Sequence, residues 1–291
     1  MFKSGFVSII GRPNVGKSTF LNYVLGQKIS IVSPKAQTTR NQIKGIYNDD
    51  ESQIVFIDTP GIHKPSTALD NSMNKAATSS LDDSDLSVLV LDASMPLGKG
   101  DEYVLSLFGK TKPDIVVINK IDLKTLPEMA DLKKEISSKY EGSTIIEMSA
   151  IDDFNTDTLI KLLKDKIPEG GPMYYPLDTI SDVDEVFRIK EIIREKLLLV
   201  LKGEVPHQSV IYLHDIKRKK EACFIRADII VKRDAQKAIV IGKGGKMIKR
   251  IGILARDDIE KMMKRRTFLE LFCRVEPNWD ESKNSLKKYG Y

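Results

Sequence analysis

The segment "GRPNVGKST", residues 11–19, has the residue types of a phosphate-binding loop. It fits the pattern G-x-x-x-x-G-K-[ST] and stands between a strand-like and a helix-like stretch. In such a loop the backbone N–H groups converge on an anion, and the helix dipole adds to the attraction. We therefore predict that Lys17 reaches the β- and γ-phosphates of a nucleotide and that the Ser18 hydroxyl ligates Mg²⁺. The alternative is a chance turn.

Two further motifs indicate the rest of a nucleotide site. "DTPG" (58–61) ends an apolar strand, so Asp58 can hold Mg²⁺ through water and the Gly61 N–H can bond the γ-phosphate. "NKID" (119–122) ends another strand, where Asp122 can accept hydrogen bonds from guanine N1–H and the exocyclic amine. Adenine has an acceptor at N1 and would leave a buried Asp122 unpaired, so these motifs favour guanine.

Smaller contacts complete the predicted site for GTP or GDP. We expect Asn119 to brace its loop, the Lys120 stem to lie over the base, and "SA" (149–150) to offer a backbone N–H to guanine O6. The predicted nucleotide-binding residues are Gly11, Arg12, Pro13, Asn14, Val15, Gly16, Lys17, Ser18, Thr19, Asp58, Thr59, Pro60, Gly61, Ile62, Asn119, Lys120, Ile121, Asp122, Ser149 and Ala150.

These motifs, in this order, resemble a translation-factor-type GTPase. In that family a threonine between the first loop and "DTPG" closes over the metal and the γ-phosphate. The resemblance assigns this role to Thr39, because the family pattern G-x-T-R aligns with "QTTR"; Thr38 is second, and either can be a polar loop residue. We expect GTP to order residues 33–42 and 58–70. The predicted metal ligands are Ser18, Thr39 and Asp58.

Ile62 stands where many GTPases have the glutamine that orients the attacking water. Because its side chain cannot hydrogen-bond water, we expect slow hydrolysis unless a partner or an ion completes the site. Some bacterial GTPases that this chain resembles use a P-loop asparagine to bind K⁺ beside the phosphates, and Asn14 is the candidate here. The alternative is that Asn14 only stabilises the turn. The predicted catalytic residues are Lys17, Thr39, Gly61 and Asn14.

A second glycine loop lies in "AIVIGKGGKMIKRIG", residues 238–252. A bare G-x-x-G is expected by chance in a chain with 18 glycines, but here isoleucines flank it at helical spacing. Two apolar helices meeting at such a loop resemble the KH module, which clamps about four single-stranded nucleotides. The alternative, a second mononucleotide site, lacks the lysine–hydroxyl ending. The predicted RNA-binding residues are Ile241, Gly242, Lys243, Gly244, Gly245, Lys246, Ile248, Lys249 and Arg250.

Charge is distributed unevenly along the chain. The net charge is +5, yet from Lys217 onward there are 21 cations against 10 acids. This asymmetry predicts a basic C-terminal module that meets nucleic acid, the alternative being a solvated lysine-rich surface. "KRKKE" (217–221) and "KMMKRRT" (261–267) either extend the basic face or are an ordinary turn and helix end. The two cysteines and three histidines show no metal-ligand spacing, and we expect the cysteines in the core.

Apolar runs alternate with helical stretches in the first half. This alternation predicts a doubly wound α/β sheet with ligands at the carboxyl ends of its strands. The expected strands are 6–11, 53–58, 86–93, 114–120 and 143–150, and the expected helices are 17–25, 70–81, 100–109, 128–140 and 156–166. "IPEGGPMYYP" (167–176) breaks the pattern with three prolines and two glycines.

A small α+β domain is expected beyond this break. Its predicted elements are a helix at 184–202, strands at 209–216 and 222–231, a helix ending near Arg265, and a last strand at 267–276. We therefore predict a GTPase domain over 1–170, a linker over 171–180 and a KH domain over 181–291. The order of elements resembles the type II KH fold.

A GTPase domain followed by a type II KH domain closely resembles the bacterial Era GTPases. That resemblance implies assembly of the small (30S) ribosomal subunit, with the KH domain holding single-stranded 16S rRNA near its 3′ end. It also implies a cytoplasmic monomer with peripheral association at the inner membrane. If the switch segments contact the KH domain or the linker, nucleotide state would set RNA affinity. The alternatives are an RNA-binding scaffold with GTP as a static ligand, and a GTPase of tRNA modification, for which no added segment is present.

Overall fold

The computed structural model describes residues 2–33, 38–109 and 111–291. The chain divides into two compact units, one of Met1–Ser66 and Asp70–Asp182 and the other of Thr67–Leu69 and Val183–Tyr291. The predicted linker, 171–180, therefore lies within the first unit. Among the described residues no helix combines the length and apolar character that a membrane crossing requires.

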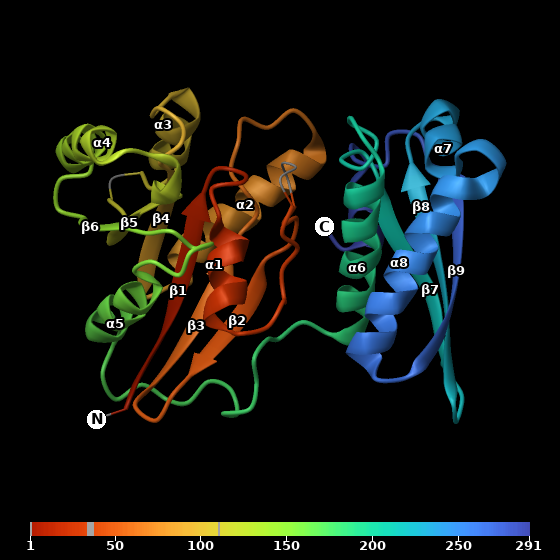
Figure 1. Cartoon of the computed structure of the whole chain (residues 1–291), viewed down its shortest axis with the longest axis horizontal. Helices are drawn as coiled ribbons and strands as arrows, with labels where there is room; N and C mark the ends of the chain where they lie inside the picture. The colour runs from red at the N-terminus through yellow and green to blue at the C-terminus, as the bar shows by residue number, and fades with distance from the viewer. Residues whose placement is uncertain (1, 34–37, 110) are drawn as a thin grey trace. The chain divides into compact units, whose positions relative to one another are not determined.

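A six-stranded sheet forms the centre of the first unit, in the order β2-β3-β1-β4-β5-β6 (Figure 1). All neighbouring strands pair in parallel except β2, which runs antiparallel to β3. The apolar runs make buried strands, and every residue of β3 and β5 is buried. The strands are β1 (Lys3–Gly11), β2 (Ile43–Asn48), β3 (Ser52–Asp58), β4 (Leu86–Asp92), β5 (Ile115–Asn119) and β6 (Thr144–Glu147).

The predicted α/β fold is confirmed, with the antiparallel β2 as an addition that the sequence did not reveal. Helices connect the parallel strands, and apolar residues of α2, α3 and α4 pack with those of β1, β4 and β5 in one buried cluster. The helices are α1 (Lys17–Val24), α2 (Ala68–Asp82), α3 (Lys99–Ser106), α4 (Leu126–Lys139) and α5 (Thr156–Lys166), with a 3-10 turn η1 (Ile121–Leu123).

Strand register brings the predicted motifs to one edge of this sheet. Asp58 of β3 pairs with Ile9 of β1, and Asp92 of β4 pairs with Asn119 of β5. Because these strands are parallel, the loops after β1, β3 and β5 all leave the sheet at its carboxyl end.

The segment after α5 lies along the β2 edge of the six-stranded sheet. It pairs with the edge strand β2, where the Ile46 N–H donates to the Ile180 carbonyl at 2.8 Å and Gly45 bridges Ser181. The Gln53 side chain accepts from the Tyr174 N–H at 2.8 Å. The proline-rich stretch is therefore a strap held along a sheet edge.

The second unit is a three-stranded sheet, in the order β7-β8-β9, packed against helices. β8 pairs antiparallel with β7 and parallel with β9. The core lies between the sheet and α6, α7 and α8, and it includes the free cysteines Cys223 and Cys273, as expected. The elements are α6 (Glu185–Val200), β7 (Val210–Arg218), β8 (Ala222–Val231), α7 (Asp234–Ile241), a 3-10 turn η2 (Lys243–Gly245), α8 (Lys246–Met263), β9 (Arg266–Val275) and α9 (Lys283–Tyr289), of which α9 was not predicted.

Candidate functional site

The first glycine loop turns from β1 into α1 through Gly16. This glycine has φ 103°, and a Cβ atom there would lie 2.1 Å from Asn119 Nδ2, so no side chain fits. Lys17 is buried, and its Nζ donates to the carbonyls of Gly11 at 3.0 Å and Arg12 at 2.9 Å. Burial lowers the pKa of Lys17 to about 8. A phosphate would give this buried cation a counter-charge.

Three hydroxyl side chains gather around Asp58, which is fully buried. Its Oδ2 accepts from Ser18 Oγ at 2.8 Å and from Ser30 Oγ at 3.0 Å, and Thr39 Oγ1 lies 2.9 Å from Ser18 Oγ. Burial raises the pKa of Asp58, although Lys17 and the three hydroxyls oppose this rise. Asp58 Oδ1 has no hydrogen-bond partner within the described part of the chain.

The oxygen ligands of this cluster fit Mg²⁺, which prefers oxygen and is held in nucleotide sites by few protein ligands plus phosphates. The described residues contain no group of three or more His, Cys, Asp or Glu side chains that could hold a metal by themselves. Ser18, Thr39 and Asp58 would therefore share the ion with a nucleotide.

A cavity of about 410 Å³ opens in front of the cluster. It is lined by the P-loop, by both candidate threonines, by Gly61 from the "DTPG" loop and by Lys120 from the "NKID" loop. Ile62 belongs to the core instead: it is fully buried, and its N–H donates to the Gly11 carbonyl at 3.1 Å. The residues lining the cavity are Pro13, Asn14, Gly16, Lys17, Ser18, Thr19, Ile31, Val32, Ser33, Thr38, Thr39, Gly61 and Lys120.

Asn119 connects the base-recognition loop to the P-loop. Its Nδ2 donates to the Val15 carbonyl at 2.8 Å, and its Oδ1 accepts from the Ala150 N–H at 3.0 Å. Since Asn119 uses this N–H, a contact of Ala150 with guanine O6 would share or replace that bond. Ser149 Oγ donates to Asp122 Oδ1 at 2.8 Å and orients the carboxylate. Asp122 is exposed in this structure, whereas its sequence motif led us to expect a buried carboxylate. A bound base would cover the carboxylate and exclude water from it.

Two basic side chains of the motifs are paired with acids from other strands and helices. Arg12 Nη1 lies 3.0 Å from Asp101 Oδ2 of α3, so this P-loop arginine is directed to α3. Lys120 Nζ pairs with Asp92 at the end of β4. Burial would raise the pKa of Asp92, but the bonds from Lys120 and Ser94 outweigh it and lower that pKa. Arg12 therefore contributes its backbone, and Lys120 has a fixed stem.

Sequence reasoning missed Asn22 of α1 and Ser30, which lies between α1 and β2. Ser30 bonds Asp58, and Asn22 holds Ser30 in place, because Asn22 Oδ1 accepts from the Ser30 N–H at 3.0 Å. No motif or spacing marks these residues. Within the predicted switch segment 33–42, residues 34–37 lie outside the described residues; Thr39 is buried in the cluster and Thr38 lines the cavity.

The second glycine loop leaves its backbone open. Gly242, Gly244 and Gly245 have φ 71°, 61° and 75°, and Cβ atoms on the last two would meet nothing within 4 Å. The exposed loop leads into the N-terminus of α8, where backbone N–H groups and the helix dipole attract phosphate. Four cations are exposed there without an ion pair to any described residue: Lys243, Lys246, Lys249 and Arg250. Ile241 and Ile248 pack against the core beneath the loop.

Beside this loop lies a groove of about 460 Å³. Sequence reasoning named only Ile248 and Lys249 among its residues, although helical spacing from Lys249 would have found the others on α8. The strand residues needed the tertiary structure. The residues lining the groove are Phe224, Ile248, Lys249, Gly252, Ile253, Arg256, Phe268, Leu269, Glu270 and Leu271.

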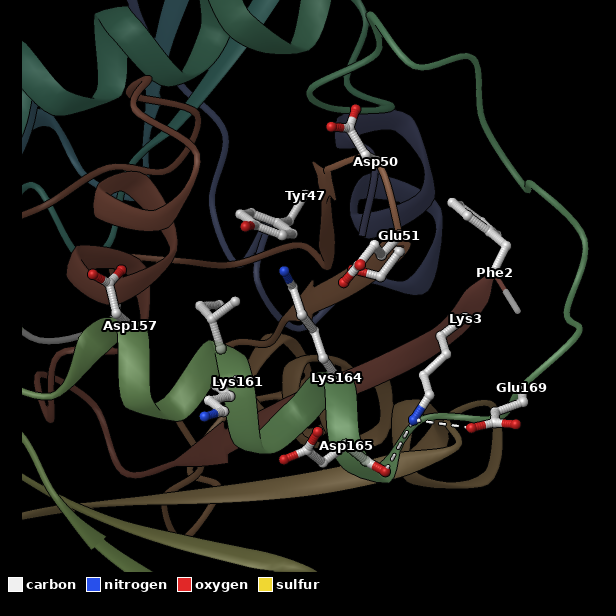
Figure 2. Close-up of a pocket in the computed structure, with 12 residues that line it drawn as sticks. Phe2, Lys3, Tyr47, Asp50, Glu51, Asp157, Lys161, Lys164, Asp165 and Glu169 are labelled. Carbon is white, nitrogen blue, oxygen red and sulfur yellow. Dashed lines mark hydrogen bonds and ion pairs between the residues drawn. The ribbon is translucent and has the colours of Figure 1, made fainter.

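A larger cavity, of about 790 Å³, lies at the amino end of β1, away from the nucleotide loops (Figure 2). Its lining mixes charges of both signs, and Lys3 Nζ pairs with Glu169 at 3.4 Å. Lys164 is paired with Asp49. Two of the three lysines that line this cavity are thus paired with acids, so among the described residues it offers no cluster of free cations for an anionic ligand.

Comparisons with known proteins support a GTPase domain around the first glycine loop and a KH domain around the second. The family model described as 50S ribosome-binding GTPase matches residues 6–120, and a KH domain model matches residues 204–280. A crystal structure of Era with MgGDPNP and nucleotides 1506–1542 of 16S ribosomal RNA is 38% identical, with a TM-score of 0.95. A variant of Aquifex aeolicus Era bound to GDP and AlF₄⁻ is 39% identical, with a TM-score of 0.94. Each match covers 100% of this chain and 99% of the other. With a P-loop GTPase fold, a KH fold and this similarity over its whole length, the chain belongs to the Era family of GTPases.

Proposed function

We propose that this GTPase binds single-stranded 16S rRNA near its 3′ end through the second glycine loop and acts in assembly of the 30S subunit. Support comes from the relative at 38% identity that was solved with nucleotides 1506–1542 of 16S rRNA. The open loop and its four exposed cations supply the matching chemistry for a sugar-phosphate backbone.

GTP hydrolysis uses the first glycine loop. This assignment rests on the hydrogen bonds of Asn119 with Val15 and Ala150. They fix the distance between the "NKID" loop, which would bind the base, and the P-loop, which would bind the phosphates. P-loop N–H groups and Lys17 hold the phosphates, and the Gly61 N–H bonds the γ-phosphate. Ser18, Thr39 and Asp58 would hold Mg²⁺, which would neutralise charge on the phosphates when bound.

The position of Ile62 in the core leaves the attacking water without an obvious partner. Hydrolysis is therefore slow until RNA, another partner or K⁺ completes the site. Asn14 lines the nucleotide cavity with φ 64° and is the residue that would help to hold K⁺.

Nucleotide state reaches the strap through β2. This strand follows the switch segment 33–42, and its Ile46 N–H bonds the Ile180 carbonyl at 2.8 Å. A GTP-dependent change in the switch would therefore act on the segment that leads to the second unit. Because such coupling is reciprocal, RNA would change GTP affinity by the same factor.

The test is RNA binding by wild type and by a Gly244→Asp variant, measured by fluorescence anisotropy with a 3′-terminal 16S RNA in the presence of GDP or a GTP analogue. Asp at this φ of 61° strains the backbone, as it would at the control position below, but it also places a negative charge where phosphate is expected. Gly203→Asp is the matched control, since Gly203 has φ 66°, open surroundings and a position outside the groove. Unchanged RNA binding by Gly244→Asp, or an equal loss in the control, refutes the RNA role.

The competing function is an RNA-binding scaffold whose GTP is a static ligand. Phosphate release with Mg²⁺, with and without RNA, separates the two, because a scaffold shows no turnover in either condition. We further propose a cytoplasmic monomer with peripheral association at the inner membrane, on the family resemblance alone; cell fractionation and sedimentation test these points.

A further inference from the structure

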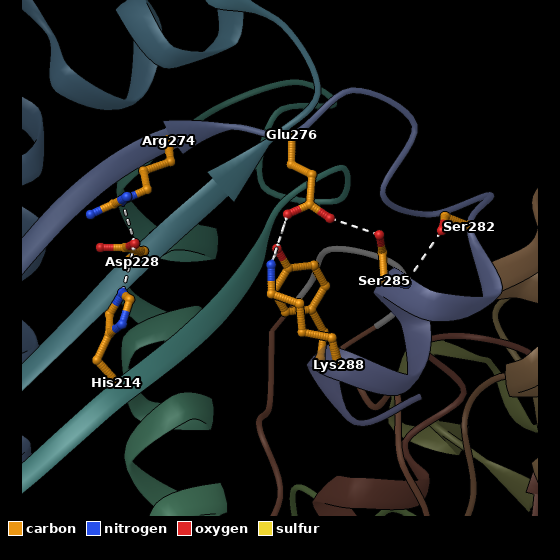
Figure 3. A network of polar contacts seen from close by, with 8 residues as sticks. His214, Asp228, Arg274, Glu276, Ser282, Ser285 and Lys288 are labelled. Atoms are coloured by element: carbon orange, nitrogen blue, oxygen red, sulfur yellow. Dashed lines mark hydrogen bonds and ion pairs between the residues drawn. The ribbon is translucent and has the colours of Figure 1, made fainter.

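Asp58 differs from the other buried aspartates among the described residues. Each of the others pairs with a basic side chain; Asp228 Oδ2, for example, lies 2.6 Å from Arg274 Nε (Figure 3). The pairs are Asp70 with His63, Asp101 with Arg12, Asp228 with Arg274, and Asp280 with Lys232. Within the described part of the chain, Asp58 accepts hydrogen bonds only from hydroxyl side chains, although it is fully buried. Because burying a carboxylate without a paired cation is costly, this acid is suited to Mg²⁺, which would supply the missing charge.

One of these hydroxyls, that of Ser30, belongs to none of the nucleotide-binding motifs. Ser30 is buried, and its Oγ donates to Asp58 Oδ2 at 3.0 Å, while Ser18 Oγ donates to the same oxygen at 2.8 Å. Two donors on one oxygen restrict the rotation of the carboxylate. They leave Oδ1, which has no hydrogen-bond partner among the described residues, available to a ligand. Partners that orient a metal-binding carboxylate in this way raise its affinity for the metal.

The position of Ser30 is fixed by Asn22 of α1. Asn22 Oδ1 accepts from the Ile29 N–H at 2.9 Å and from the Ser30 N–H at 3.0 Å, and its Nδ2 donates to the Ser30 carbonyl at 2.8 Å. Ile29 and Ile31, the neighbours of Ser30 in the sequence, are both buried. One side-chain amide and two apolar side chains therefore hold a segment that is neither helix nor strand. This arrangement keeps the Ser30 hydroxyl next to Asp58.

Ser30 and Thr39 join the Asp58 cluster from different parts of the segment between α1 and β2. Thr39 lies within the predicted switch segment 33–42, and its Oγ1 is 2.9 Å from Ser18 Oγ. Ser30 precedes that segment and is fixed to α1 by hydrogen bonds. We therefore expect Thr39 to act only together with the γ-phosphate, whereas Ser30 keeps its bond to Asp58 with GDP as well as with GTP.

We propose that Ser30, held by Asn22, positions the Asp58 carboxylate for Mg²⁺ in both the GDP and the GTP state. Ser30 would not touch the ion; it acts through Asp58 and is a positioning residue. The inference rests on the proposed role of the first glycine loop in GTP binding and hydrolysis, and it adds two residues that no motif contains. Its consequence is that the protein retains its nucleotide at a lower Mg²⁺ concentration.

The experiment follows the release of a fluorescent GDP analogue from the full chain at increasing concentrations of free Mg²⁺. Release should slow as the ion binds, because Mg²⁺ is held jointly by the protein and the phosphates. The midpoint is the Mg²⁺ concentration that gives half of this slowing. For Ser30→Ala the midpoint should rise about tenfold, the smaller of the losses expected when a residue that orients a metal ligand is removed. In excess EDTA the variant should release GDP at the wild-type rate, because no ion is left to position.

Two further variants test the path through Asn22 and the role of the nucleotide state. Asn22→Ala should raise the midpoint several-fold, because the segment that carries Ser30 loses three hydrogen bonds. With a non-hydrolysable GTP analogue in place of GDP, Ser30→Ala should again raise the midpoint about tenfold. Thr39→Ala should raise it with the GTP analogue only.

Ser4→Ala is the matched control. Ser4 is also a buried serine, and its Oγ donates to the Pro172 carbonyl at 2.8 Å near the amino end of β1, away from the nucleotide loops. This variant loses a buried hydrogen bond, as Ser30→Ala does, so thermal unfolding should show a lower Tm for both. The midpoint should move for Ser30→Ala and stay at the wild-type value for Ser4→Ala.

The outcomes separate this inference from the proposed function. A wild-type release rate that does not respond to Mg²⁺ would contradict the proposed metal site itself. If wild type responds but Ser30→Ala keeps the wild-type midpoint, Ser30 does not position Asp58, and the proposed function stands. A midpoint shift of the same size in Ser4→Ala, or faster release from Ser30→Ala in EDTA, would mean that the substitution loosens the whole domain, which also overturns the inference.

Discussion

Asn119 and Val15, from different motifs of the nucleotide site, are joined by a hydrogen bond of 2.8 Å from Nδ2 to the main-chain carbonyl. The other end of the Asn119 amide accepts from Ala150 at 3.0 Å. One buried side chain thus connects the loops that follow β1, β5 and β6. These bonds hold the loop that contains Asn119 at a fixed spacing from the P-loop.

Replacing Asn119 by Ala should therefore weaken GTP and GDP together. Both hydrogen bonds are lost, and the buried partners are left unsatisfied at about 1–3 kcal/mol each. We expect at least a tenfold rise in Kd for fluorescent GDP and GTP analogues, together with a lower Tm. A loss confined to GTP would mean that Asn119 acts on the γ-phosphate and not on the spacing of the loops.

Asp122→Asn should exchange guanine for xanthine. The amide can donate to the xanthine O2, whereas the guanine amine loses its charged acceptor. Competition of GTP and xanthosine triphosphate for the variant, measured with a fluorescent nucleotide, should favour the latter by at least tenfold. Ser149→Ala, which removes the 2.8 Å bond to Asp122, should weaken GTP only a few-fold and keep its preference. An Asp122→Asn variant that still prefers GTP contradicts the base assignment, as does equal competition by ATP in wild type.

Thr39→Ala should reduce the affinity for a non-hydrolysable GTP analogue by roughly tenfold in Mg²⁺ and leave GDP affinity nearly unchanged, because the switch threonine acts with the γ-phosphate. Thr38→Ala is the matched control, since Thr38 lines the cavity but is not among the hydroxyls that bond Asp58. If Thr38→Ala instead of Thr39→Ala reduces the affinity for the GTP analogue, Thr38 is the metal ligand.

Potassium dependence tests Asn14. GTP turnover in wild type should be several-fold faster in K⁺ than in Na⁺, and Asn14→Gly should abolish the difference while keeping nucleotide affinity. Glycine is the suitable replacement because φ at this position is 64°, which it adopts without strain. Equal rates in the two salts for wild type would leave Asn14 as a turn-stabilising residue only.

The His63–Asp70 pair predicts a pH-dependent stability. His63 Nε2 lies 3.2 Å from Asp70 Oδ1, and the bond to Asp70 raises the pKa of His63 above 6.5 even though burial opposes it. Burial would raise the pKa of Asp70, but bonds from His63 and Ser66 outweigh it and lower that pKa. The histidine contribution is full below its unfolded pKa and is lost as pH rises through the folded value. The aspartate contribution is present above its unfolded pKa and is lost as pH falls.

Asp70→Asn should therefore lower Tm more at about pH 6 than at about pH 9, because only the lower pH keeps His63 charged. Thermal unfolding monitored by circular dichroism at the two pH values measures this. The His63→Gln variant, which lacks the titrating group, should show a Tm difference from wild type that likewise shrinks at the higher pH. A Tm loss independent of pH would mean that the bonds that Ser66 donates to Asp70 dominate.

Much of the fold was readable from local pattern. Runs such as "QIVFID" are apolar throughout because both faces of a central parallel strand are buried, and the structure makes this one β3. β2 was not predicted, because "IKGIYN" mixes polar and apolar residues. Such a mixture is typical of an edge strand, which is only partly buried. Its antiparallel pairing with β3 depends on the hairpin between them.

The amino-acid sequence by itself determined the two glycine loops that we propose as phosphate sites, since glycine spacing and the adjoining cations are properties of contiguous residues. It also determined the alternation that produces the first sheet. Only the tertiary structure decided that Ser30 bonds Asp58, that Asn119 joins three loops and that Phe224 stacks on Phe268. Those contacts join residues far apart along the chain, and strand register and helix packing, which no local pattern encodes, set their distances.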